Sequence, residues 1–224
     1  MTNYILKRSN RKTLGLYIRS GRLEVRAPAK CPQSEIDRFV ISKQKWILDK
    51  LAISQEQISH KTAFVLGYGS EIYFCGTLYP IAAKTGTQAG FDGKYFYMPS
   101  DLNHMQIKDV CIKIYRRLAK IHITNVVVAF AQQMGVAPSS VKTNSAKTRW
   151  GSCSSKKNLN FSWRLIMAGN DVIEYVVVHE LAHLLQMNHS AKFWAIVESV
   201  LPDYRRRQAR LKELQKRLAT ENWD

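Results

Sequence analysis

Residues 172–185, VIEYVVVHELAHLL, constrain the fold more than any other part of this sequence. Their apolar side chains predict a largely buried helix. The pattern H-E-x-x-H stands inside that helix and is formed by His179, Glu180 and His183. A spacing of four residues puts both histidines on one face, about one turn apart. Two imidazoles and a carboxylate in a buried helix are energetically unfavourable unless something binds them.

A metal ion is the partner that satisfies all three polar groups. Two neutral imidazoles can hold one zinc ion, and zinc lowers the pKa of its bound water to about 7. Glu180 lies about 100° around the helix from His179 and can take the proton of that water. The pattern therefore predicts zinc as the cofactor and Glu180 as a catalytic base. The alternative is a pair of structural histidines that are hydrogen-bonded in a core.

A catalytic zinc site needs a third protein ligand, for which His189 is the best candidate. On an unbroken helix it would point about 240° away from the preceding histidine, so the chain must turn after about Leu185. We expect Asn188 to take a left-handed conformation in that turn and Ser190 to cap the next helix. The alternative third ligand is Glu198, on that following helix.

The first hundred residues are predicted to be rich in strands. Residues 13–19 and 22–27 alternate around a Ser-Gly turn and predict a hairpin. A helix is expected over residues 32–53. The pattern changes near residue 100, which predicts a β-rich N-terminal part with one helix (1–100) and a metal-binding domain (101–224).

The second half is predicted to be mainly helical. Residues 105–134 predict one long helix, or two that join near Thr124. Two strands are expected, 141–148 and 159–167, around the turn SSKKN. Asp171 with Glu174 three residues later predicts a capping box at the start of the motif helix.

The net charge of +17 is the strongest signal in the composition. Such a charge attracts anions, including nucleic acid and nucleotide phosphates, although a solvated basic surface explains it equally well. A basic amphipathic helix over residues 205–217 has the same two interpretations. No apolar run is long enough for a membrane span, no secretory signal is visible and the four cysteines are scattered. These features predict a cytoplasmic protein without a membrane partner.

Two stretches resemble the YgjP-like metallopeptidase-domain family, a relative of the WLM and SprT-like zinc peptidases. They are TRWGSCSSKKNLNFSWRLIMA at 148–168 and VIEYVVVHELAHLLQMNHSAKFW at 172–194. The resemblance implies a zincin-like α+β fold, with the metal-binding helix beside a small antiparallel sheet. It also implies that His189 is the third ligand, since this residue matches the last histidine of the WLM pattern H-E-x-x-H-x5-H.

Arg149 begins RWGSCS, the second signature of that family. A fixed positive charge there can neutralise an oxyanion or a phosphate, and Arg164 on the following predicted strand is a second candidate. A purely structural role for Arg149 is an equal alternative.

Three functions remain open from the sequence. The first is a zinc metallopeptidase in which Glu180 activates water. The second keeps the metal and hydrolyses a nucleoside triphosphate such as UTP. The third is a nucleic-acid-associated protein, whose metal site acts on DNA-bound targets or is only structural. The sequence does not indicate an oligomeric state.

Overall fold

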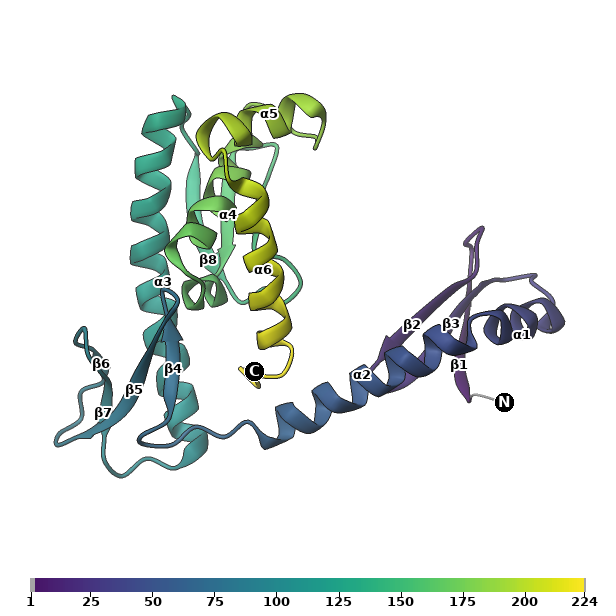
Figure 1. Ribbon diagram of the computed structural model, residues 1–224, viewed down its shortest axis with the longest axis horizontal. Helices are drawn as coiled ribbons and strands as arrows, with labels where there is room; N and C mark the ends of the chain where they lie inside the picture. The colour runs from purple at the N-terminus through teal and green to yellow at the C-terminus, as the bar shows by residue number, and fades with distance from the viewer. Residues whose placement is uncertain (1–2, 224) are drawn as a thin grey trace. The chain divides into compact units, whose positions relative to one another are not determined.

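The computed structural model describes residues 3–223, which form six α-helices, one 3₁₀ helix and three small sheets (Figure 1). The α+β class is confirmed, and strands dominate the N-terminal part, as expected. The chain divides into two compact units, one built mainly on residues up to Phe64 and one on Val65–Arg217 with Trp223. The predicted change from strand patterns to helical patterns near residue 100 corresponds to the passage from strand Phe96–Pro99 to helix His104–Met134. The assignment of 1–100 and 101–224 as domains stays a prediction.

The N-terminal unit is a three-stranded sheet with two helices. Its elements are β1 (Tyr4–Ser9), β2 (Gly15–Arg19), β3 (Arg22–Pro28), α1 (Gln33–Ser42) and α2 (Gln44–Ala63). The central strand β3 pairs antiparallel with β2 and parallel with β1. The predicted hairpin is β2–β3, and its turn residues Ser20 and Gly21 both have the positive φ that such a turn requires, 48° and 73°.

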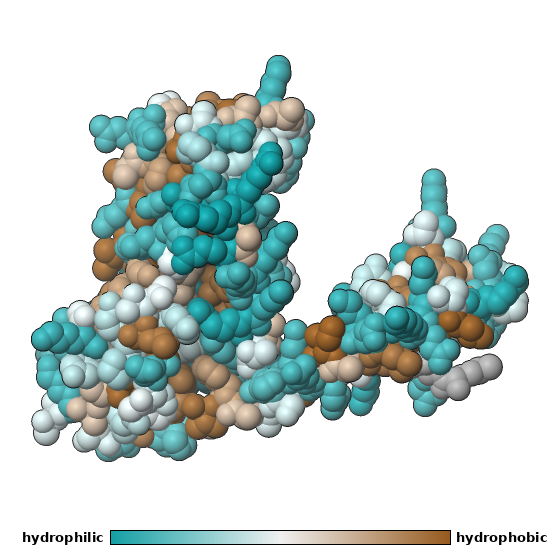
Figure 2. Space-filling view, viewed as in Figure 1, coloured by the Kyte–Doolittle hydropathy of each residue, from teal (hydrophilic) through white to brown (hydrophobic). Residues whose placement is uncertain are grey.

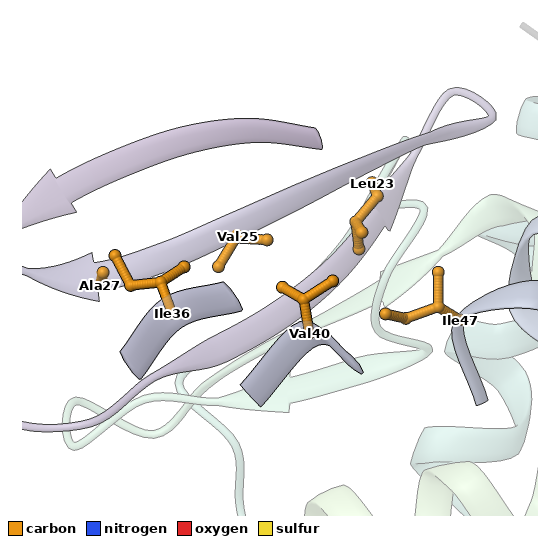
Figure 3. Close-up of a cluster of buried hydrophobic side chains, with 6 residues drawn as sticks. All are labelled: Leu23, Val25, Ala27, Ile36, Val40 and Ile47. Carbon is orange, nitrogen blue, oxygen red and sulfur yellow. The ribbon is translucent and has the colours of Figure 1, made fainter. Parts of the chain in front are cut away.

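The core of this unit lies between one face of β3 and both helices (Figure 3). It consists of Leu23, Val25, Ala27, Ile36, Val40 and Ile47. The single helix predicted over 32–53 is wrong, because the chain breaks at Lys43 and the second helix continues to Ala63. The Lys43 N–H donates to the Val40 carbonyl, 3.1 Å away, and this i to i−3 bond tightens the last turn of α1. Both helices still contribute buried residues to the same core.

The second unit begins with a four-stranded sheet that packs on a long helix. Its strands are β4 (Glu71–Phe74), β5 (Thr77–Lys84), β6 (Gly90–Phe91) and β7 (Phe96–Pro99), in the order β4-β5-β7-β6. The helix is α3 (His104–Met134), which is one continuous helix rather than two. A capping box of Asn103 and Gln106 starts it, and Gly135 ends it with a left-handed φ of 64°. Tyr115 on α3 donates to the Tyr73 carbonyl at 2.6 Å, which joins helix and sheet.

A second sheet of this unit has the strands β8 (Ser140–Asn144), β9 (Gly151–Cys153) and β10 (Asn158–Ser162). β10 pairs antiparallel with β9 around SSKKN and parallel with β8, so the sheet is mixed where an antiparallel one was expected. The strand predicted over 141–148 stops early because the Asn144 side chain accepts the Ala146 N–H, 3.0 Å away. The strand predicted over 159–167 changes after Ser162 into the buried 3₁₀ helix η1 (Trp163–Met167).

Three further helices complete the unit: α4 (Asn170–Ala182), α5 (Ala191–Val200) and α6 (Tyr204–Leu218). In Figure 1, α4 lies between α3 and α6, and it also contacts β9 and α5. Within residues 3–223, no helix is both long and apolar enough to cross a lipid bilayer. The helix that carries the H-E-x-x-H pattern is therefore surrounded by other elements of its own unit.

Candidate metal centre

The helix α4 is buried as the sequence predicts: nine of its thirteen residues are buried. The capping box predicted from Asp171 and Glu174 is wrong, since α4 has no side-chain cap. Both carboxylates instead bind arginines of α6: Asp171 accepts from Arg210, and Glu174 accepts from Arg207 at 2.5 Å. These charge-assisted pairs replace the weaker bonds to the backbone. They hold α6 against the start of the helix that carries the candidate ligands.

The three candidate histidines come together at the other end of α4. Their nearest ring nitrogens all lie within 4.8 Å of one another, and the Nε2 atoms of His179 and His189 are 3.0 Å apart. His179 is in the last turn of α4, and His183 directly follows the helix. Glu198, the alternative third ligand, is exposed and does not belong to this cluster.

The turn that brings His189 back differs in detail from the expected one. The helix ends at Ala182, earlier than Leu185, and the next turn closes through Leu185 and Gln186 N–H bonds to the Ala182 carbonyl. Asn188 does not have a positive φ, so the expected left-handed turn at this residue is wrong. Ser190 occupies the N-cap position of α5 as predicted, but its hydroxyl accepts from the Gln186 amide at 3.3 Å instead of capping the helix. Side-chain bonds inside the turn thus replace the left-handed residue.

The electrostatic setting favours the neutral imidazole of His179 and of His183. Burial, together with the neighbouring His183 and His189, lowers the pKa of His179 to about 3. Burial is also the main cause of the lowered pKa of His183. His183 donates from Nδ1 to the Gln186 carbonyl at 3.2 Å, which fixes the ring and leaves Nε2 as the basic nitrogen. Neutral imidazoles of this kind are the form that binds a metal.

The residues present fit a divalent first-row metal ion. Two Nε2 atoms face each other at 3.0 Å, and His179 also has a buried Nδ1 without a hydrogen-bond partner among the described residues. Imidazole suits zinc, copper, iron and nickel, and three protein ligands are the number that catalytic zinc sites use. His179, His183 and His189 could therefore hold such an ion with an open coordination position.

Glu180 lies beside this cluster and against β9. Its side chain is only 6% exposed, and it packs on Gly151 so closely that a Cβ at Gly151 would lie 2.5 Å from Oε1. Burial raises the pKa of Glu180 to about 7, although the positive charge of Arg149 opposes that shift. A carboxylate with such a pKa can accept and return a proton near neutral pH.

Comparison with known proteins shows the family of the chain. The family description "YgjP-like, metallopeptidase domain" matches residues 12–214. The chain belongs to the YgjP-like metallopeptidase-domain family. Membership in this family supports a metal-dependent hydrolase of the peptidase type. No curated protein matches the chain significantly.

Two solved structures are similar to part of the chain. One is the metallopeptidase zymogen abylysin of Pyrococcus abyssi, 24% identical, with 44% of this chain and 92% of that one covered and a TM-score of 0.35. The other is the metallopeptidase zymogen jannalysin of Methanocaldococcus jannaschii, 22% identical, with 42% and 95% covered and a TM-score of 0.37. The family assignment depends on the sequence match alone.

The two arginines considered from the sequence occupy different environments. Arg149 is exposed and close enough to influence Glu180 electrostatically. Arg164 is buried in η1, where it donates to the Ser145 and Trp223 carbonyls at 3.1 and 3.0 Å. The predicted position of Arg164 on a strand is therefore wrong, and these bonds tie its guanidinium to the backbone of its own surroundings.

An aromatic wall around the histidines escaped the sequence reasoning. Phe193 of α5 packs on all three rings, with a centroid distance of 4.6 Å to His183. Trp194 stacks on His189 at 5.9 Å and on Tyr204 at 5.4 Å. The sequence does contain a signal for this wall, because the adjacent aromatic residues Phe193 and Trp194 lie in the first turn of the helix that follows His189. This wall keeps the candidate ligands in an apolar setting.

Proposed function

We propose that the chain is a zinc-dependent hydrolase of the metallopeptidase type. In this proposal His179, His183 and His189 hold the zinc ion, and Glu180 is the general base. The observation that carries it is the convergence of three ring nitrogens within 4.8 Å, next to the buried Glu180. Membership in a metallopeptidase-domain family supports a peptide bond as the target.

Each residue has a chemical task in this proposal. When bound, zinc supplies a Lewis acid that polarises a carbonyl group and acidifies water. Glu180 accepts the proton of the attacking water and passes it to the leaving amine, which its pKa of about 7 allows. Arg149 supplies an exposed positive charge that can stabilise the developing oxyanion.

A nucleoside triphosphate such as UTP is the competing substrate. The net charge of +17 and the exposed Arg149 favour an anionic substrate, and the same base would activate water. Peptide remains the preferred substrate because the family description names a metallopeptidase domain. Action on DNA-bound targets is a third prediction, which rests on the net charge of +17 and on the resemblance to the SprT-like peptidases.

The test is a hydrolysis assay of the zinc-loaded protein with fluorogenic peptides and with UTP. Glu180→Gln should lower kcat by about 100-fold or more, as expected when a general base is lost, and should retain zinc. Glu198→Gln is the matched control, because Glu198 is exposed on the neighbouring helix α5, and it should keep both activity and zinc. Full activity of Glu180→Gln would contradict the proposed base, and loss of zinc from Glu198→Gln would restore the alternative ligand.

A further inference from the structure

A groove of about 440 Å³ runs along one side of the N-terminal unit, between β2 and α2. The strand contributes four consecutive residues, 16–19, and the helix contributes, besides Ser54, Trp46, Lys50, Ile53 and Gln57. These helix positions recur at intervals of three or four residues, so they form one face of α2. The groove is distinct from the histidine cluster, because all of its lining residues belong to the other unit.

The groove follows the outer edge of β2. Consecutive strand residues point to opposite faces of a sheet, so a groove lined by four in a row must lie at the strand's edge. β2 is a terminal strand of its sheet, and within residues 3–223 only β3 pairs with it. An edge of this kind presents backbone N–H and C=O groups that can pair with another extended chain.

The groove lining combines apolar side chains with polar ones and carries a positive charge at two points. Trp46 and Ile53 are 41% and 45% exposed, and Leu16 and Ile18 also line the groove. Figure 2 shows hydrophobic side chains exposed along α2 of this unit. Arg19 and Lys50 are the only charged residues in the lining, and no carboxylate accompanies them.

We propose that this groove binds an extended polypeptide segment, which adds as a fourth strand beside β2. Apolar side chains of the segment contact Trp46 and Ile53, and an acidic side chain pairs with Lys50 or Arg19. Four residues of β2 span about 13 Å, so the segment is about four residues long. The site adds a peptide-binding function to the N-terminal unit and does not depend on the metal chemistry.

Two other occupants fit the groove less well. Single-stranded nucleic acid needs a row of cations along its phosphates, whereas this groove has two cations beside a strand edge, which pairs with a polypeptide backbone. A second copy of the chain, paired through its own β2, would add the two cations of its own lining and no carboxylate to balance them. Charge complementarity therefore favours an acidic peptide.

The test measures binding of a fluorescent peptide of alternating valine and glutamate to the full chain, by fluorescence anisotropy. A chelator removes metal from the assay, so the peptide is not hydrolysed and the binding result does not depend on whether the proposed hydrolase activity is correct. The matched probes are a valine–lysine peptide, the same valine–glutamate peptide with alternate backbone nitrogens methylated, and a single-stranded oligonucleotide. Methylation removes the strand hydrogen bonds but keeps the side chains, and it should weaken binding about tenfold or more.

Variants of α2 locate the site. Lys50→Glu should weaken binding about fivefold, while Lys61→Glu, with the same charge change in the last turn of α2, should stay within about twofold. Trp46→Ala should weaken binding about tenfold, because it removes apolar contact. The proposal is overturned if the methylated peptide binds as tightly as the unmethylated one, or if Lys50→Glu and Lys61→Glu weaken binding equally. It is also overturned if the oligonucleotide binds more tightly than the peptide. Dimerisation that Trp46→Ala abolishes, with no peptide binding, would show that a second copy of the chain occupies the groove instead.

Discussion

The carboxylate of Glu180 rests against the bare backbone of Gly151, and a methyl group at Gly151 would come within 2.5 Å of Oε1 and 2.7 Å of Cδ. β9 therefore fixes where the Glu180 side chain can lie. Glycine is needed at this point because of a close approach, and not because of a special φ, since Gly151 is an ordinary strand residue. This relationship links the RWGSCS segment to the motif helix by direct packing.

Gly151→Ala should lower catalysis much more than stability. The added methyl group would also lie 2.6 Å from Cγ of Glu180, so the whole side chain must move, at about 1 kcal/mol for a strained rotamer. A displacement of about 1 Å can lower a rate about 100-fold, so kcat should fall by that order while zinc remains bound. Kinetics, zinc content and a thermal melt of the same sample measure the three effects.

Gly67→Ala is the matched control for this prediction. A Cβ at Gly67 would meet only the His104 ring, at an ordinary 3.5 Å. Its kcat should remain close to that of the parent. The proposed position of Glu180 is wrong if Gly151→Ala is fully active.

His189→Ala should weaken zinc binding by more than about 100-fold, since even loss of a residue that only supports a ligand costs 10- to 100-fold. The parent should also melt at a higher temperature with zinc than with a chelator, because a ligand that binds only the folded chain at about 100 times its Kd adds about 2.7 kcal/mol. Competition with a chromophoric chelator and paired thermal melts measure both quantities. Glu198→Ala should behave as the parent does, and equal zinc affinity of His189→Ala would exclude His189 as a ligand.

The sequence predicted the histidine cluster better than the elements that surround it. The histidine spacing and the apolar pattern of α4 are local properties of a helix, so the convergence of His179 and His183 could be predicted without tertiary information. The capping box failed because Asp171 and Glu174 bind arginines more than thirty residues away in the chain. Such pairing depends on tertiary contacts, which single-sequence patterns do not contain.

The same limit explains the errors in the sheets and turns. The parallel pairing of β8 with β10 and the packing of Gly151 on Glu180 both join segments that are separate in the sequence. The turn before His189 depends on hydrogen bonds of Gln186 rather than on the intrinsic preference of Asn188. Local propensity is a weak guide where side chains offer alternative partners.

Arg207→Ala should destabilise the C-terminal helix. The Arg207 side chain is 15% exposed and donates to Glu174 at 2.5 Å, to Asp203 at 2.8 Å and to the Asp171 carbonyl at 3.0 Å. Its loss removes the arginine that pairs with the partly buried Glu174 and leaves Asp203 with Arg206 alone, so the free energy of unfolding should fall by about 2 kcal/mol. Chemical denaturation measures the change.

Arg206→Ala is the control for that change, because Arg206 is 72% exposed and pairs only with Asp203 among the described residues. An exposed pair of this kind contributes about 0.5 kcal/mol or less. Equal effects of the two substitutions would mean that α6 is not held through Arg207. The basic face of α6 is thus partly used inside the fold, which reduces the charge that remains available for an external anion.

Glu24 should make the stability of the N-terminal unit depend on pH in the acid range. Lys7 and Arg26 lie 2.6 and 2.7 Å from its carboxylate and lower the pKa of Glu24 to about 2 from the ordinary 4.5. Between these values the unfolded chain binds a proton that the folded chain does not, so stability falls as the pH drops from about 4.5 toward 2. Above about pH 5 this contribution is fully present.

Glu24→Gln should therefore be less stable than the parent at neutral pH, and the difference should shrink as the pH approaches 2. Glu56→Gln is the control, because Glu56 is 72% exposed and lies 3.7 Å from His60, and its stability should follow that of the parent. Urea denaturation of the three proteins at about pH 7, 4 and 3 measures the effect. A difference between Glu24→Gln and the parent that stays constant over this range would show that the carboxylate does not keep its charge in the folded sheet, and that Lys7 and Arg26 stabilise β3 by some means other than ion pairing.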